Sequence, residues 1–363
     1  MANKRTRLAA CVLAAAPLAT SVALAVPAAD AAPSPKLHVV NVLSRHFVGP
    51  LQFAVSGHHV YVADAFTSTL KEIGGKVLAH GPDPSKGGDI AGVAVNRHRH
   101  EIAYTSSNGR HTNTRLTVLN QRDGSTLWSV NLAKFEADNN PDHKIFYGVK
   151  HPSKCVRNAL SGAGVPVSYH GDVDSHPYAV TALRNGAWAV ADAGGNDLLR
   201  VSKDGKISLI RLLPHETMVV SQQLAAEQHL PHCVVGVRYH VEGVPTDVER
   251  VGSHGPLYVS TLPGFDAANL GRVYKIRPVS GHRHKIGDGF NNATNLAVSK
   301  GGTVLVAELG NGAISRLTPN GPVPVIQLQG AVAVERANGR WYASTAPAVT
   351  GAQSNGEVVV LGT

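Results

Sequence analysis

The sequence predicts an all-β protein, and within that class a six-bladed β-propeller. The main observation is a short apolar motif that recurs six times and ends each time in valine. A run of β-favouring residues follows each motif after a few turn residues, and a third run follows in every unit. Regularly repeated units of short strands are typical of propellers. The motifs are QFAV at 52–55, GVAV at 92–95, PYAV at 177–180, PTDV at 245–248, NLAV at 295–298 and AVAV at 331–334.

Turn residues indicate that the strands within a unit are joined by hairpins. Pairs such as Asp123-Gly124 and Asp204-Gly205 supply the positive φ angles that tight hairpins require. A fourth β-rich run follows these turns, for example at 126–130 and 206–210. Each unit is therefore predicted to hold four strands.

The two ends of the chain are expected to meet in one blade. The sixth unit stops after three strands, at Thr363, whereas a lone apolar run at 37–43 precedes the first motif. That run is the natural fourth strand of the sixth blade, since its pairing would satisfy an otherwise open edge. A ring closed in this way needs no partner chain, so a monomer is expected.

Two stretches interrupt the repeat, at about 133–174 and 213–243, and are expected to be loop insertions on one face of the propeller. Cys155 lies in the first insertion and Cys233 in the second. The third cysteine, Cys11, lies in the predicted signal peptide described below, so the remaining two favour one disulfide that pins the insertions together in an oxidising compartment.

The first 31 residues have the order of a secretory signal peptide. A basic start with Lys4, Arg5 and Arg7 precedes an apolar stretch from Leu8 to Val26, and small residues follow. The mature propeller is therefore expected to span 32–363 and to be secreted, with no transmembrane segment. The formal net charge of +9 is compatible with attraction to an anionic cell-wall polymer. Aromatic residues make up only 5% of the chain, so nucleic acid is not an expected partner.

Several segments resemble the ScyD/ScyE family of secreted propellers, over nearly all of the mature chain. The most specific are FEADNNPD at 135–142 and DSHPYAV at 174–180, and ADAGGNDLLRV at 191–201 and GFNNATNLAV at 289–298 also match. His176 stands where the family is expected to have asparagine. More distantly, the chain is similar to NHL-repeat and gluconolactonase-like propellers. The resemblance implies a fold and an export route but no established reaction, so it assigns no catalytic residue.

The entrance of the inner strands is the predicted binding place, because concave sites with a few convergent polar groups are the usual ligand sites. Carboxylate and amide oxygens there would suit Ca²⁺, with Asp174, Asp247 and Asn295 as candidate ligands. The candidate residues at this mouth are Asp174, His176, Asp247 and Asn295, with Glu136 and Asn139 folding over them from the first insertion.

A second set of polar residues ends the second strand of every unit and is expected to be structural. Short polar side chains at strand ends accept backbone N–H bonds and shape the next turn. The residues are Asp64, Ser106, Asp192, Thr261, Glu308 and Thr345.

The sequence favours a non-catalytic binding or scaffolding module whose partner is a small molecule, a glycan or a protein. The alternative is a metal-dependent hydrolase of small lactones or esters. The resemblance to lactonase-like propellers implies a glutamate at the opening of the first blade, yet residues 49–52 read GPLQ. No GxSxG motif for a nucleophilic serine is present either.

Overall fold

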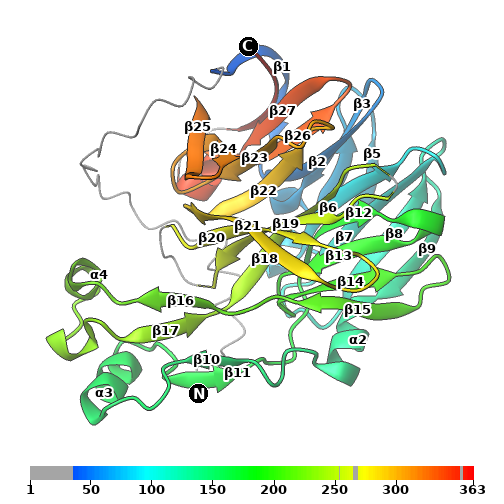
Figure 1. Ribbon diagram of the computed structural model, residues 1–363. Helices are drawn as coiled ribbons and strands as arrows, with labels where there is room; N and C mark the ends of the chain where they lie inside the picture. Colours follow the sequence, from blue (N-terminus) through cyan, green and yellow to red (C-terminus); the bar gives the residue numbers. More distant parts are fainter. Residues whose placement is uncertain (1–35, 253, 265–268, 352–354) are drawn as a thin grey trace.

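The computed structural model describes residues 36–252, 254–264, 269–351 and 355–363, and the predicted signal peptide lies outside them. These residues form an all-β protein with seven four-stranded antiparallel sheets (Figure 1). Six of the sheets contain a copy of the sequence motif in their first strand.

The strands of the six repeated sheets follow one another along the chain. The first sheet holds β2 (Pro50–Ser56), β3 (His59–Asp64), β4 (Thr69–Glu72) and β5 (Val77–His80). The second holds β6 (Asp89–Asn96), β7 (Glu101–Ser107), β8 (Thr114–Asn120) and β9 (Thr126–Asn131). The third holds β12 (Pro177–Ala182), β13 (Trp188–Asp192), β14 (Asp197–Val201) and β15 (Ile207–Leu212).

The second half of the chain repeats the pattern. The fourth sheet holds β18 (Gly243–Arg250), β19 (Leu257–Pro263), β20 (Gly271–Ile276) and β21 (Arg283–Phe290). The fifth holds β22 (Ala293–Val298), β23 (Val304–Glu308), β24 (Ala313–Thr318) and β25 (Gly321–Gln327). The sixth holds β26 (Ala331–Ala337), β27 (Arg340–Thr345), β28 (Gly356–Gly362) and β1 (His38–Phe47). Short 3₁₀ turns lie at Ala65–Thr67, Pro84–Lys86, Arg184–Gly186 and Pro347–Thr350.

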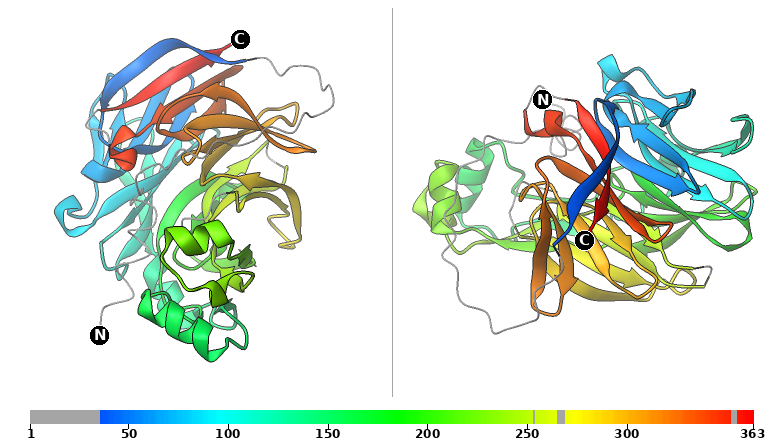
Figure 2. Two further views of the ribbon diagram at one scale, coloured as in Figure 1. Left: turned by 90° about the vertical axis from the view of Figure 1, so that its left-hand side faces the viewer. Right: turned by 90° about the horizontal axis from the view of Figure 1, so that it is seen from above.

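The first strands of these sheets make a closed ring. Each contacts the first strand of the next sheet, in the order β2, β6, β12, β18, β22, β26 and back to β2. We call these six the inner strands. The N-terminal strand β1 pairs antiparallel with β28, so the two ends of the chain share the sixth sheet (Figure 2).

The hydrophobic core is divided among the interfaces between neighbouring sheets. Between the first and second sheets, Tyr61 and Leu70 pack against Ile90 and Ile102, and all four are buried. Because each interface has its own core, a chain of 363 residues folds without one large central core.

The two insertions differ from the expected loops, since they form a seventh sheet. The first contains α2 (Leu132–Asn139), β10 (Phe146–Gly148), α3 (Lys154–Gly162) and β11 (Ser168–His170). The second contains β16 (Glu216–Val219), α4 (Gln222–Glu227), the 3₁₀ turn η4 (His232–Val234) and β17 (Arg238–Val241). Their strands pair in the order β11, β10, β17, β16, which we call the insertion sheet (lower left in Figure 1).

The predicted disulfide is confirmed: Cys155 in α3 is bonded to Cys233 in η4, with 6.4 Å between the Cα atoms. Val156, Leu160 and Val241 form a small core beside it. Covalent and apolar contacts thus join two segments that are far apart in the sequence. No helix in the described part of the chain has the length and apolar character needed to cross a membrane.

Candidate functional site

Asp64, Asp192, Glu308 and Thr345 accept backbone N–H bonds at the ends of the second strands as the sequence predicts, whereas Oγ1 of Thr261 has no hydrogen-bond partner among the described residues. Asp64 accepts hydrogen bonds from the backbone N–H groups of Val48 (3.2 Å) and Gly49 (2.7 Å). Glu308 likewise accepts from the N–H of Asn291 (2.7 Å). Both acceptors hold the segment that leads into the inner strand of their own sheet.

Asp247 and Asn295, two of the predicted site residues, lie together at the centre of the ring. The Asn295 side-chain oxygen accepts from the N–H of Val334 (2.7 Å), and its amide donates to Gln52 (3.0 Å). Asp247 accepts from the N–H of Leu296 (2.9 Å). The bonds to Val334 and Leu296 tie neighbouring inner strands, and the bond to Gln52 reaches past β26 to β2.

Gln52 extends this network across the ring. Its side-chain nitrogen donates to the carbonyl of Thr246 (3.2 Å), although β2 and β18 occupy opposite positions among the six inner strands. Side chains therefore bridge the centre at this level, and a ligand could reach Asp247 or Asn295 only by displacing them.

Beyond this bridge, toward the far ends of β18 and β26, three carboxyl groups face one another: Asp247, Glu249 and Glu335. Burial raises the pKa of Asp247 to about 7 and that of Glu335 to about 7. Burial and repulsion from Glu335 also raise the pKa of Glu249. Because β22 lies between β18 and β26 in the ring, this repulsion indicates that the side chains point toward the centre.

Asp174 and His176, the other predicted pair, meet two residues that the sequence did not single out. His111 Nδ1 lies 2.8 Å from Asp174 Oδ1, and His176 Nε2 lies 2.7 Å from Asp89 Oδ2. The two imidazole rings are stacked, with 4.5 Å between their centroids. Burial tends to lower the pKa of His176, but the opposing effect of Asp89 prevails and the pKa is raised. The result is a pair of stacked imidazoles, each bonded to one carboxylate.

The β7–β8 turn holds His111 in place through Asn108. The Asn108 side-chain oxygen accepts from the N–H groups of Thr112 (2.9 Å) and Asn113 (3.0 Å). His111 itself has a positive φ of 53°, a conformation that this network stabilises. The imidazole is thereby directed to Asp174, and its side chain is only 7% exposed.

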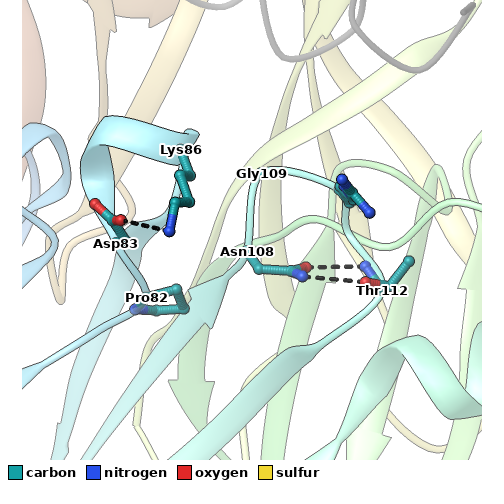
Figure 3. A pocket seen from close by; sticks show the side chains of 7 residues that line it. Pro82, Asp83, Lys86, Asn108, Gly109 and Thr112 are labelled. Carbon is teal, nitrogen blue, oxygen red and sulfur yellow. Dashed lines mark hydrogen bonds and ion pairs between the residues drawn. The ribbon is translucent and has the colours of Figure 1, made fainter.

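A cavity of about 510 Å³ lies on the other side of this turn (Figure 3). Most of its exposed lining surface is apolar, and the charged side chains at it are the basic Lys86 and Arg110 and the single carboxylate of Asp83. Asp83 contacts Lys86 at 3.3 Å, which leaves Arg110 as the excess positive charge. The complete lining is Pro82, Asp83, Lys86, Asn108, Gly109, Arg110 and Thr112.

The first insertion brings Glu136 beneath Asp174 but leaves Asn139 outside. Glu136 is buried on α2 and accepts a hydrogen bond from the backbone N–H of Asp174. Burial, together with repulsion from Asp192, Asp142 and Asp174, raises the pKa of Glu136 to about 9. Asn139 is exposed, and its side chain donates to the carbonyl of Phe135 (2.7 Å).

Glu136 belongs to a buried acidic cluster between α2, the third sheet and the insertion sheet. Burial is the main cause of a raised pKa for Asp142, to about 6, and for Glu242, to about 8. It also raises the pKa of Asp192 and Asp197. We call Glu136, Asp142, Asp192, Asp197 and Glu242 the acidic cluster.

The three Ca²⁺ candidates from the sequence fall into two separate networks, because Asp174 is bonded to His111 whereas Asp247 and Asn295 tie the inner strands. Among the residues that the structure describes, no three His, Cys, Asp or Glu side chains are gathered as ligands of a metal ion.

Comparison with known proteins identifies a fold. No family model matches the chain, and no curated protein matches it. Among solved structures, a PQQ-bound aldose sugar dehydrogenase from Streptomyces coelicolor is 14% identical with a TM-score of 0.54, covering 91% of this chain and 99% of that one. A gluconolactonase from Xanthomonas campestris is 13% identical with a TM-score of 0.51, covering 93% and 99%. Together with the ring of four-stranded sheets, these similarities show a β-propeller fold; at such identity they carry no activity over.

Proposed function

We propose that this chain is a secreted, six-bladed propeller of the ScyD/ScyE type that binds a small, negatively charged, polar molecule between the connection at 82–86 and the turn at 108–112. The observation that carries the proposal is the 510 Å³ cavity with Lys86 and Arg110 in its lining, next to the stacked His111 and His176 rings. The six blades correspond to the six repeated sheets, and export rests on the basic and apolar segments at 1–31.

The chemistry of the lining selects the class of ligand. Arg110 and Lys86 attract an anion, and the guanidinium group suits a carboxylate or phosphate in particular. Asn108 and Thr112 add polar atoms but are already bonded to each other, so they shape the wall more than they bind. An acidic sugar or a sugar phosphate combines the charge and polarity that this lining favours.

Hydrolysis of small lactones or esters is the second candidate, and one observation favours it. His111 presents Nδ1 to Asp174, an arrangement in which a carboxylate orients an imidazole as a general base. A base of this kind would work without the metal that the lactonase resemblance implies.

The proposal is tested by calorimetric titration of the mature, oxidised protein with glucuronate, gluconate and glucose 6-phosphate, with uncharged glucose for comparison. At least one anion should bind, glucose should not, and affinity should fall about tenfold in Arg110→Met, as expected for loss of a charged contact of roughly 1.4 kcal/mol. Lys203→Met is the matched control, because Lys203 is exposed and pairs with its exposed neighbour Asp204, away from the cavity lining.

Two results would overturn binding at this place: no anion of the panel binds, or Arg110→Met and Lys203→Met bind equally well. The hydrolase alternative predicts turnover of gluconolactone that disappears in His111→Gln, whereas a binding module gives no turnover above the uncatalysed rate. Export is tested separately by locating the full chain in the culture medium, and adhesion to an anionic wall predicts that salt releases it from cells.

A further inference from the structure

The two most specific segments of the family resemblance and a third matching segment converge on one buried place. Residues 135–142 contribute Glu136 and Asp142, residues 174–180 begin at Asp174, and residues 191–201 contribute Asp197. In the structure these residues are close enough for their charges to interact, between α2 and the third sheet. The function proposed above uses only Asp174 and leaves the acidic cluster unexplained.

The cluster contains buried oxygen atoms that have no hydrogen-bond partner. Asp197 is fully buried, and neither of its carboxyl oxygens is bonded. One oxygen each of Glu136, Asp142, Asn140 and Asn196 is also unpaired. Buried polar atoms in folded proteins are nearly always satisfied, so a concentration of unpaired oxygens in one place indicates a missing partner that carries positive charge.

Gly195 leaves space for that partner. A Cβ atom at this position would lie 3.3 Å from Glu136 Oε2, 3.6 Å from Asp197 Cγ and 3.7 Å from the carbonyl oxygen of Asp174. The absent side chain therefore leaves one Glu136 oxygen, the Asp197 carboxyl carbon and the Asp174 carbonyl oxygen within 4 Å of one point beside the Gly195 backbone.

We propose that one Ca²⁺ ion binds beside Gly195, held by the carboxylates of Glu136 and Asp197 and by the carbonyl oxygen of Asp174. The donors are all oxygens, which suits a hard cation and not a transition metal that prefers nitrogen or sulfur. Ca²⁺ accepts six to eight oxygens in irregular geometry, whereas Mg²⁺ demands an octahedron and retains water, so a buried set of protein oxygens favours Ca²⁺. The two carboxylates balance the charge of the ion, and Asn140 and Asn196 each have one buried side-chain oxygen without a hydrogen-bond partner in the described part of the chain.

The ion would have a structural consequence for the neighbouring pair of histidines. Glu136 already accepts the backbone N–H of Asp174, and the Asp174 carboxylate bonds to His111. An ion bonded to Glu136 and to the Asp174 carbonyl would hold that segment in place. The inference does not depend on the proposed function, because the ion needs no ligand in the cavity.

Gly195→Ala is the most informative variant. The backbone of Gly195 does not have the positive φ that disfavours other residues, and the new methyl group would meet only the flexible end of Glu136 closely. Alanine should therefore fold normally, while its methyl group would take up space between Glu136 and the Asp174 carbonyl, beside the proposed position of the ion. Asp197→Asn removes one charged ligand, and Asp138→Asn is the control, since Asp138 is exposed on the same helix and pairs with Lys134.

The experiment strips the mature, disulfide-bonded protein with EDTA, removes the chelator, and measures Ca²⁺ uptake by equilibrium dialysis together with the melting temperature with and without Ca²⁺. Wild type and Asp138→Asn should take up one ion per chain and melt at a higher temperature with Ca²⁺. Gly195→Ala and Asp197→Asn should take up no Ca²⁺, and Ca²⁺ should not raise their melting temperatures. After metal removal, Asp197→Asn should melt at or above the temperature of metal-free wild type, because it lacks a buried charge.

The proposal is overturned if stripped wild type takes up no Ca²⁺ at millimolar concentration, or if Gly195→Ala binds Ca²⁺ as wild type does. If Asp197→Asn does not fold, the test depends on Gly195→Ala alone. Its circular dichroism spectrum and its melting temperature without metal should then match those of wild type, which shows that it is native. Arg110→Met should retain full Ca²⁺ uptake, which separates this result from failure of the anion site.

Discussion

The carboxyl groups at the centre of the ring make stability depend on pH, and Glu335→Gln is the change that reveals it. Burial raises the pKa of Glu335 in the folded protein from its ordinary value of 4.5 to about 7, despite the opposing N–H of Arg336 and the charge of Arg97. In the unfolded chain the group returns to its ordinary value. The folded state therefore holds its proton over a range in which the unfolded state releases it.

The sign and size of the effect follow from this difference. Below pH 4.5 both states are protonated and the full stability is present, whereas stability falls as pH rises toward 7 and levels off above it. One group with such a shift accounts for about 3 kcal/mol, since each pKa unit corresponds to about 1.4 kcal/mol. Glu335 is only partly buried, so about 2 kcal/mol is the expected contribution.

Urea unfolding at pH 5, 6, 7 and 8 measures the effect as the difference between Glu335→Gln and wild type. From pH 5 to pH 8 the free energy of unfolding of the variant should rise by about 2 kcal/mol relative to wild type, because wild type loses the contribution of Glu335 and glutamine does not titrate. Glu357→Gln is the control: Glu357 pairs with the exposed Arg45 on the surface, and its difference from wild type should be nearly constant. A constant difference for Glu335→Gln as well would refute the reasoning.

Three further changes test other parts of the structure. Replacing both Cys155 and Cys233, which are 78 residues apart, by alanine should lower the free energy of unfolding by about 4 kcal/mol in the chain-entropy description. Limited proteolysis should then cut the insertions first, and an unchanged digestion pattern would contradict this prediction. Arg272→Met should lower the free energy of urea unfolding by about 3–5 kcal/mol, because it leaves the fully buried Glu216 carboxylate without its ion-pair partner. The added change Glu216→Gln removes that unpaired charge and should restore most of the loss. Asp192→Ala removes the acceptor for three backbone N–H groups and one hydroxyl, so the free energy of unfolding should fall by about 3 kcal/mol. A fall of less than about 1 kcal/mol would show that these donors find other partners.

The repeated sheets could be predicted from the sequence because each unit carries its own signal. The same order of apolar motif, turn and β-rich run recurs in six units. A strand that is hard to recognise in one unit can therefore be assigned by comparison with the others. The insertions carry no such signal: β10 and β11 have three residues each, and β10 joins the other insertion by pairing Gly148 with His240, about 90 residues away. Pairing across that distance is decided by packing around Tyr239 and Val241 and by the disulfide, which no local pattern encodes.

The candidate site could be predicted only in part, for a similar reason. Asp174 and His176 stand at the start of a recognised motif, whereas Asp89 and His111 lie in a strand start and a turn of the preceding unit. His111 was one histidine among 19 until the fold placed it beside Asp174. The N–H accepting role of Asp64 and Glu308 was predictable because position in a repeat determines it.

The distribution of polar bonds explains why the site lies where it does. At the centre of the ring, Gln52 and Asn295 are engaged in holding inner strands together, so the part of a propeller most often regarded as a channel is closed at that level. Under the proposed function, the ligand would therefore be bound by loops that take no part in closing the ring. The turn at 108–113 and the end of the first insertion are such connections, and both are pinned: the turn by Asn108, and the insertion by Glu136 and the disulfide. A rigid support for otherwise free loops is what a binding site requires; the turn at 108–113 offers such support next to the cavity, and the end of the first insertion offers it next to Asp174.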